Sequence, residues 1–508
     1  MGTVEAGTPS GEVEALPGVI VSDGIHVTRT DRDGHFWLPT DITRSDFVCV
    51  SIPSGYEAPV DGDNLPLFWD RIDPTSTSVQ TFRFRFTPVD QGAYSLMVFA
   101  DIHLQGRDPS AESRTDCTST APADYVQFRE QAVPVARAHA AGKKVPVYGI
   151  SLGDMTMSNY WNRFTMADYK ELVKEIGVPF FHIIGNHDHD LAGSEHEATA
   201  TYRAHFGPTY YSFNIGNRHF IALDNMDCPN YNNSSATNDG KGYYCRVDED
   251  QLAWMRRDVA ALDPSVRDIV LLTHVPLATW SGTRGNVTPV WTTTNGKEVL
   301  DILSGYRVEV LSGHYHIAQN FALSETAGQH TLPAACGTYW YTLLCSDGVP
   351  AGFTDFQVTQ EASTRELVPF GEGYRDRTRY QVYSSGVTTQ TGTNDFRSHP
   401  SGIPDETAGY RKAVLVNLYG WEPGWSVSVV EGSRAGRTGE MVWRVDPEVR
   451  DRFYDKTVNY KSCSWLNSTK TYHMFLYTPE DPSQTVTMQV KDASGKTMFI
   501  IPNIQIHD

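Results

Sequence analysis

Short apolar runs that each stop at a residue able to bind a metal are the main pattern of this chain. Five such runs precede, in order, the motifs Asp101-x-His103, Gly153-Asp154, Gly185-Asn186-His187-Asp188, His274 and Gly313-His314-x-His316. The runs are rich in Val, Ile, Leu and Phe and are separated by helical stretches, so they predict buried strands of an α/β layer structure. Polar residues beyond the carboxyl ends of such strands usually line a ligand crevice. The pattern therefore predicts one site built from five strand ends.

The segments between these strands show two further periodicities. Apolar residues recur at helical spacing over 123–141, 166–176, 195–205 and 248–262, which predicts helices. The segment 210–223 alternates around Gly216-Asn217 and predicts a β-hairpin. Polar stretches at 105–122, 225–247 and 281–295 are expected to be long loops that shape the mouth of the site.

Alternating segments with frequent turn residues flank this region on both sides. They predict a small β-sandwich over 18–90 and a β-rich domain over 346–508, on either side of a catalytic domain at 91–345. Residues 1–17 are expected to form a flexible tail. A chain of 508 residues is long enough for this division into several domains.

Composition and charge narrow the possible partners. The formal net charge of −19 disfavours a nucleic-acid polymer, because such binding depends on a basic surface that releases counterions. No apolar stretch approaches the roughly 18 to 20 residues that span a bilayer, so no transmembrane segment is predicted. The seven cysteines fit no zinc motif; Cys228 with Cys245, and Cys336 with Cys345, could form disulfides or remain buried thiols.

The ordered motif set D-x-H, G-D, G-N-H-D, H and G-H-x-H resembles that of the calcineurin-like metallophosphoesterases. The resemblance covers about residues 91–335. The flanking segments resemble those of a bacterial three-part subgroup, with a transthyretin-like or carboxypeptidase-regulatory-like module in front. This resemblance implies an α/β fold with a central four-layer βα-sandwich between two β-rich regions. Because that subgroup is mostly exported, we expect a periplasmic or cell-surface protein whose signal peptide is absent from this sequence.

The resemblance also implies a dinuclear metal centre. Asp101, His103 and His316 would hold one ion, and Asn186, His274 and His314 the other, with Asp154 bridging both. Mixed imidazole and carboxylate ligation suits Mn, Fe, Zn or Ni. Purple acid phosphatases have a tyrosine where this chain has Met157, so an iron-tyrosinate centre is disfavoured. The glycines at 153, 185 and 313 are expected to let the backbone approach the ions.

Further residues are expected to act on the substrate. In the family pattern His187 is not a ligand and would serve as general acid, and Asp188 could fix its tautomer and raise its pKa. His189 and Asp190 are expected to form an exposed polar turn. Candidates for substrate contacts are Tyr339 and Trp280, Trp340 as a stacking wall, and Asn159 and Arg284 as phosphate contacts.

The expected function is hydrolysis of phosphate mono- or diesters by a hydroxide held in the dinuclear centre. A phosphorylated small molecule, sugar or lipid is the expected substrate. The alternative is a cell-surface glycan-binding protein whose phosphoesterase core is inactive; the complete ligand set disfavours it.

Overall fold

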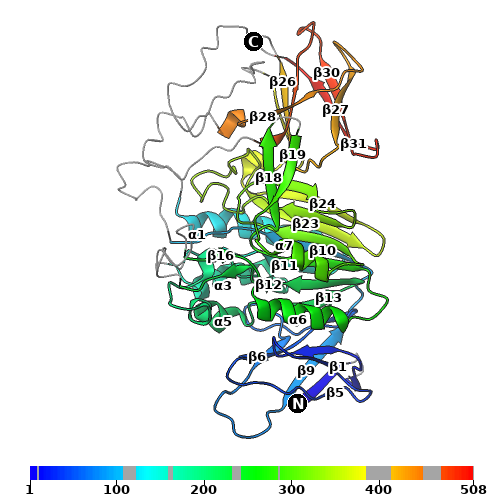
Figure 1. Ribbon diagram of the computed structural model, residues 1–508. Helices are drawn as coiled ribbons and strands as arrows, with labels where there is room; N and C mark the ends of the chain where they lie inside the picture. Colours follow the sequence, from blue (N-terminus) through cyan, green and yellow to red (C-terminus); the bar gives the residue numbers. More distant parts are fainter. Residues whose placement is uncertain are drawn as a thin grey trace.

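The sheets of the molecule fall into three groups that follow one another along its long axis, with the N-terminal strands at one end and the C-terminal strands at the other (Figure 1). The computed structural model describes residues 1–7, 11–106, 122–157, 164–230, 242–283, 286–384, 413–449 and 471–506. The middle group carries the five strand ends that the sequence singles out.

Two small sheets form the N-terminal group, and the apolar cluster that they share continues between the two central sheets. Their strands are β1 (Gly2–Gly7), β2 (Val13–Ala15), β3 (Ile20–Ser22), β4 (Val27–Arg29), β5 (His35–Phe36), β6 (Phe47–Val50), β7 (Tyr56–Glu57), β8 (Trp69–Arg71) and β9 (Phe82–Pro88). One sheet has the order β2-β1-β9-β7, with β5 paired to β1, and the other β4-β3-β6-β8. The expected flexible tail at 1–17 is wrong, because β1 buries Val4 and Ala6 and pairs in parallel with β9.

The first central sheet combines the strands of three of the motifs with two strands from later in the chain. It contains β10 (Ala93–Phe99), β11 (Val147–Ser151), β12 (Phe180–His182), β23 (Gly352–Thr359) and β24 (Ser363–Pro369). Its order is β12-β11-β10-β23-β24, and β10, β11 and β12 run parallel. Although β23 and β24 were expected in the C-terminal domain, β23 pairs antiparallel with β10 and both extend the central sheet.

The second central sheet carries the other two motifs. It contains β13 (Tyr211–Ile215), β14 (Arg218–Ala222), β17 (Asp268–Leu272), β20 (Arg307–Ser312), β21 (Gln319–Ala322) and β22 (Ala327–Thr331). Its order is β13-β14-β17-β20-β22-β21, with β14, β17, β20 and β22 parallel. The predicted hairpin at Gly216-Asn217 is confirmed, because β13 and β14 pair antiparallel on either side of it.

The two central sheets pack against each other and carry helices on their outer faces, which makes four layers (Figure 1). Alternation along β10 explains the packing: Leu96 and Val98 join the cluster between the sheets, whereas Met97 and Phe99 join the helix-facing cluster. The helices against the first sheet are α1 (Asp124–Gln127), η1 (Phe128–Ala132), α2 (Val133–Gly142), α3 (Met166–Val173), η2 (Lys174–Ile176) and α5 (Ala200–Phe206). The short helix α4 (Glu195–Ala198) buries Ala198 in a separate small cluster. Helices α6 (Glu249–Ala260) and α7 (Gly296–Ile302) cover the second sheet.

Two more sheets around one apolar cluster form the C-terminal group. They contain β25 (Tyr380–Tyr383), β26 (Val414–Leu418), β27 (Ser426–Glu431), β28 (Glu440–Arg444), β29 (Thr471–Tyr477), β30 (Val486–Lys491) and β31 (Thr497–Ile504). Their orders are β25-β26-β29-β28 and β27-β30-β31. The chain is therefore β-rich at both ends of an α/β centre.

Two expectations for the connecting segments need correction. The predicted loop at 281–295 is largely a hairpin of β18 (Ala278–Thr283) and β19 (Asn286–Trp291), in which Pro289 stands opposite Trp280. Neither suggested disulfide is formed in the structure, between Cys228 and Cys245 or between Cys336 and Cys345.

Candidate metal centre

The five strand ends meet at one edge of the two central sheets. Asp101 and His103 follow β10, Asp154 follows β11, and Asn186 begins the short helix η3 (Asn186–Asp188) after β12. From the second sheet, His274 follows β17, and His314 and His316 follow β20. Parallel strands within each sheet place these ends together, so side chains from residues 101 to 316 converge.

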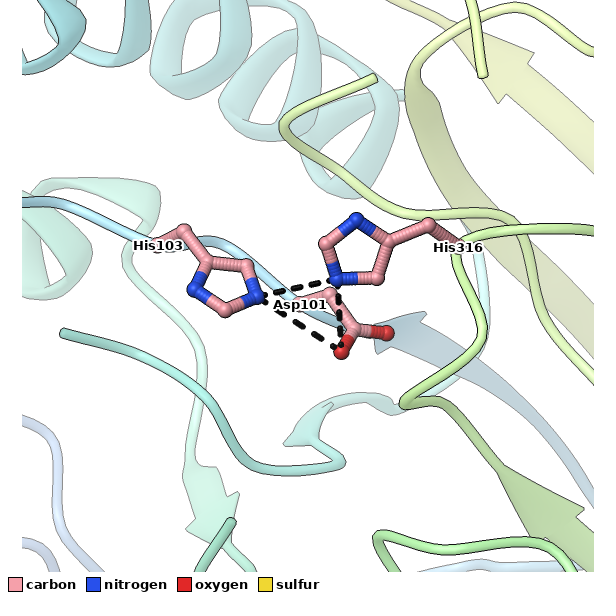
Figure 2. Close-up of side chains that lie close together, drawn as sticks. All are labelled: Asp101, His103 and His316. Carbon is pink, nitrogen blue, oxygen red and sulfur yellow. Dashed lines mark hydrogen bonds and ion pairs between the residues drawn. The ribbon is translucent and has the colours of Figure 1, made fainter. Parts of the chain in front are cut away.

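One group of donors comprises Asp101, His103 and His316 (Figure 2). The Nε2 atoms of His103 and His316 lie 2.9 Å apart. Asp101 Oδ1 lies 3.8 Å from Nε2 of His103 and 3.3 Å from Nε2 of His316. Figure 2 shows the carboxylate and both imidazoles turned toward a common point.

A second group comprises Asn186, His274 and His314. Asn186 Oδ1 lies 3.1 Å from both His274 Nε2 and His314 Nδ1, and these two nitrogens are 3.2 Å apart. Asp154 stands between the groups, with Oδ2 3.4 Å from His103 Nε2 and 3.3 Å from His274 Nε2. One carboxylate oxygen thus faces both groups at almost equal distance.

These spacings fit two metal ions. Bonds of about 2.0–2.2 Å to nitrogen and oxygen place neighbouring ligands of one ion roughly 3.0–3.5 Å apart in tetrahedral or octahedral geometry. The donor pairs within each group lie close to that range. The donors are also the nitrogen and oxygen types that transition metals take.

The backbone is strained at five of these seven residues. Asp101, His103, Asp154, His314 and His316 have φ values of 52°, 50°, 53°, 72° and 55°. Non-glycine residues rarely adopt such left-handed conformations, and each costs on the order of 1–3 kcal/mol. Strain that is concentrated on the converging side chains indicates that their placement serves a function.

Glycines allow the chain segments to approach each other this closely. Gly153 has a φ of +91°, and a Cβ there would lie 2.7 Å from the backbone nitrogen of Gly185. A Cβ at Gly313 would lie 2.5 Å from Asp101 Oδ2. The expected close approach of the backbone at these glycines is therefore present.

Hydrogen bonds behind the donors orient two of the imidazoles. His274 Nδ1 lies 2.8 Å from the carbonyl oxygen of Leu152, so it donates there and leaves the Nε2 lone pair for the site. His103 Nδ1 contacts Sδ of Met157 at 2.9 Å. Met157, which replaces a tyrosine of the purple acid phosphatases, thus lies behind a donor of the first group.

Burial and charge act against each other on the pKa values of the site. Burial by itself raises the pKa of Asp154, but the imidazoles of His274, His187 and His103 outweigh it and hold that pKa well below its usual value. Burial lowers the pKa of His274, yet the carboxylates of Asp154 and Asp101 raise it to about 9. The field of the carboxylates therefore favours positive charge between the two groups.

His187 lies beside the first group and is half-buried. Its ring centroid is 5.0 Å from that of His103, and its backbone N–H donates to Asp154 Oδ1 at 2.8 Å. Burial lowers the pKa of His187 more than the nearby Asp154 raises it. The expectation of a raised pKa at His187 is therefore wrong.

Asp188 connects the loop after β11 to the loop after β12 through backbone hydrogen bonds. Its Oδ1 accepts the backbone N–H groups of Met155 and Thr156, at 3.0 and 3.1 Å, and its Oδ2 accepts that of Gly185 at 3.0 Å. Burial raises the pKa of Asp188 to about 7, and Asp154 adds to the effect. The Asp188 carboxylate therefore holds the backbone segments that carry Asp154 and Asn186. It was expected to bind the His187 ring instead.

The candidate substrate residues separate in the structure. Tyr339 lies at the site, with its ring 5.1 Å from that of His103 and 4.9 Å from that of His316. Trp340 is fully buried and its indole donates to the carbonyl of Ile102, so the expected stacking wall is wrong at this residue. Trp280 packs between Phe321, Trp421 and Tyr472 at the C-terminal sheets. Asn159 and Arg284 lie outside the described residues.

Near the site, Tyr315 was not anticipated and His189 differs from its expected position. Tyr315 is 37% exposed and its ring lies 5.3 Å from that of His314. Its position between two histidines of the G-H-x-H motif is a signal that the sequence offers. His189, expected in an exposed turn, is fully buried and its Nδ1 lies 2.8 Å from the carbonyl oxygen of Gly185.

Several solved structures are similar to this chain. A dimetal phosphatase from Danio rerio matches with 16% identity and a TM-score of 0.35, over 55% of this chain and 96% of its own. A purple acid phosphatase from yellow lupin (Lupinus luteus) matches with 12% identity and a TM-score of 0.34, and a 5'-nucleotidase from Candida albicans with 12% and 0.33. Each of these two covers 55% of this chain and 52% of its own. No curated protein matches the chain.

Three family models match successive parts of the sequence. The N-terminal model of the calcineurin-like phosphoesterases matches residues 5–89, the calcineurin-like phosphoesterase model 94–318, and the corresponding C-terminal model 329–498. Among the described helices, none is long and apolar enough to cross a membrane. The four-layer centre is the metallophosphatase fold, and the chain belongs to the calcineurin-like phosphoesterase family, whose members are metal-dependent hydrolases.

Proposed function

We propose that this chain hydrolyses phosphate mono- or diesters of a small molecule, sugar or lipid, with two ions of Mn, Fe, Zn or Ni as cofactors. The observation that carries the proposal is the position of Asp154, whose Oδ2 faces His103 and His274 at 3.4 and 3.3 Å. Two such ions supply, when bound, a water of lowered pKa and positive charge for the phosphoryl oxygens.

The chain's own residues have separate roles in this proposal. Asp101, His103 and His316 would hold one ion, Asn186, His274 and His314 would hold the other, and Asp154 would be shared by both. The Leu152 carbonyl keeps the Nε2 lone pair of His274 directed at its ion. Asp188 acts through the backbone, because it fixes Met155, Thr156 and Gly185 next to two of the ligands.

His187 is proposed as the group that protonates the departing alkoxide. It is half-buried beside His103 and Asp154 and belongs to the same cluster of potential donors. A positioned proton donor contributes roughly 10² to 10⁴ in rate. Tyr339, beside His103 and His316, is proposed to contact the substrate next to the first ion.

The experiment that tests this function measures turnover of an aryl phosphate and a bis-aryl phosphate by protein supplied with Mn or Zn. We expect Asp154→Asn to abolish turnover, because it removes the charge shared by both groups. His187→Ala should keep its metal and lose about 10²-fold or more on alkyl esters, but little on aryl esters, whose leaving groups need no proton.

His205→Ala is the matched control, since His205 is a half-buried histidine on α5 that takes no part in the site. Turnover by Asp154→Asn at the wild-type rate would contradict the proposal. An equal loss of turnover by His187→Ala on aryl and on alkyl esters would contradict the role of His187 as the acid. The ratio of the two wild-type activities decides between monoester and diester preference.

Two further parts of the proposal concern the whole protein. We place the protein outside the cytoplasm, because the three-part subgroup that its flanking segments resemble is mostly exported; fractionation of the producing cells tests this. We also propose that the chain divides into N-terminal, catalytic and C-terminal domains. The glycan-binding alternative gains no support, since all seven expected ligands converge.

A further inference from the structure

A second cluster of potential metal ligands lies behind the η3 loop and shares no residue with the site above. It consists of His189, Glu195 and Cys228, one ligand atom of each lying within 4.8 Å of the others. His189 and Cys228 are fully buried, and the side chain of Glu195 is 34% exposed. His189 directly follows the G-N-H-D motif, Glu195 lies in the first turn of α4, and Cys228 directly follows β15 (Met226–Asp227).

Hydrogen bonds orient the side chains of His189 and Glu195 in this cluster. His189 Nδ1 lies 2.8 Å from the carbonyl oxygen of Gly185, so it donates there and presents Nε2 to the cluster. One carboxylate oxygen of Glu195, Oε2, accepts the backbone N–H of Cys228. The other, Oε1, lies 3.5 Å from His189 Nε2.

A fourth donor stands next to these three. Asp224 is buried, its Oδ1 accepts the backbone N–H of Met226 at 3.1 Å, and its Oδ2 lies 3.8 Å from His189 Nε2. Asp224 is outside the group of three whose ligand atoms lie within 4.8 Å of one another, so its carboxylate faces the imidazole from beside that group. Such charges are costly to bury unless they are paired or bind a metal.

The donor set selects the kind of ion. Sulfur, nitrogen and oxygen ligands in a set of four are typical of tetrahedral Zn²⁺, with bonds of about 2.3 Å to sulfur and 2.0–2.2 Å to nitrogen and oxygen. The spacings of 3.5 and 3.8 Å from Nε2 to the two carboxylates are compatible with ligand separations in such a site after a small contraction. Three protein ligands, with the Asp224 carboxylate beside them to take the fourth position, would leave no open position, as in a structural zinc site.

We propose that His189, Glu195, Cys228 and Asp224 bind a third, structural Zn²⁺ ion that holds the η3 loop in place. The link to the loop is the hydrogen bond from His189 to the Gly185 carbonyl, since Gly185 directly precedes Asn186 and His187. Fixing His189 therefore fixes the loop that carries a ligand and the proton donor of the site above. The proposal that this ion binds does not depend on the hydrolytic function proposed for the site at Asp154.

X-ray absorption at the zinc edge of the full-length wild-type protein tests the proposal without any variant. We expect one zinc-sulfur path at about 2.3 Å. A zinc environment of nitrogen and oxygen alone would overturn the proposal. A Cys228–Cys245 disulfide in peptides prepared without reductant would also overturn it, because that sulfur could no longer bind.

Two variants separate this site from the centre at Asp154. Cys228→Ala should contain about one zinc equivalent fewer than wild type, and should lose the sulfur-to-cobalt absorption of cobalt-loaded protein. Cys49→Ala, a half-buried thiol in β6, is the matched control and should keep both. If Cys228→Ala keeps the full zinc content and the absorption, the proposal fails. Asp154→Asn should keep the absorption, so failure of one site is distinguishable from failure of the other.

Discussion

At the scale of single residues, the sequence is most informative where a polar side chain ends a buried strand. The positions of Asp101, Asp154 and His274 could be predicted because parallel strands bring their carboxyl ends to one edge. The hydrogen-bond partners of Asp188 and the burial of Trp340 could not be predicted, because they depend on which backbone groups from distant loops meet. The left-handed conformation at His316 likewise leaves no mark in the sequence.

That conformation leads to a prediction about stability. His316 has a φ of 55°, and alanine in such a backbone keeps the strain whereas glycine relieves it. The free energy of unfolding of His316→Gly should therefore be about 0.5–1 kcal/mol higher than that of His316→Ala. The relief of strain outweighs the greater conformational entropy of glycine in the unfolded chain. Urea denaturation of both variants measures the difference. A glycine variant that is less stable than the alanine variant would show that the strain is absent.

At the scale of elements, periodicity predicted the central strands and the hairpin at Gly216-Asn217, but it missed β18 and β19. Their hairpin contains Pro289, and a proline normally argues against a strand unless the strand lies at an edge. The residues of β23 fall within the predicted C-terminal β-rich domain at 346–508, but in the fold they belong to the central region. The alternation of β23 does not say which neighbour it pairs with, and in the fold it pairs with β10.

Asp355 on β23 ties three elements of the central region together. Its carboxylate accepts hydrogen bonds from Ser95 on β10, from His139 Nε2 at 3.0 Å, and from Lys143 at the end of α2. Burial raises the pKa of Asp355, but these partners outweigh it and lower that pKa below its usual value. The carboxylate form of Asp355 therefore stabilises the folded chain.

The pH dependence of stability follows from this shift. Because the folded pKa is lowered, the contribution is present above the unfolded value of about 3.9 and is lost as the pH falls through the folded value. Asp355→Asn should lower the free energy of unfolding by about 1.5–3 kcal/mol at pH 7, and by less below about pH 4. Urea titrations at several pH values measure this.

Asp268→Asn is the control, because the partner of Asp268 is the exposed Arg307 and such pairs contribute little. Equal effects of Asp355→Asn at pH 7 and at the lowest pH at which the chain stays folded, well below the unfolded pKa, would rule out the assigned role of the carboxylate.

At the scale of the whole molecule, the C-terminal sheets reach the metal centre through Asp347. Asp347 Oδ2 accepts the backbone N–H of Ala318, two residues after His316, at 2.8 Å and lies 3.3 Å from His473 Nε2 on β29. Asn417 on β26 donates to the carbonyl of Asp347 at 3.0 Å. Sequence patterns could not predict this connection, because it joins residues that are 29, 70 and 126 positions apart in the sequence.

We therefore expect Asp347→Asn to weaken metal binding at the His316 side, because it loosens the loop that carries this ligand. Loss of residues that orient metal ligands typically costs 10- to 100-fold in affinity, and about tenfold is expected here because Asp347 acts through the backbone. Metal titration followed by calorimetry measures the change. Glu422→Gln, which breaks the Arg365–Glu422 pair between β24 and the C-terminal sheets, should leave the affinity unchanged. Unaltered affinity in Asp347→Asn would refute the connection.

The most direct test of the account is anomalous diffraction at the metal edge from crystals of the protein supplied with Mn or Zn. Two peaks about 3.5–4 Å apart are expected, one on each side of Asp154 Oδ2, with His103 and His316 at one and His274 and His314 at the other. A single peak at this site, or two peaks that Asp154 does not bridge, would contradict the proposed dinuclear centre.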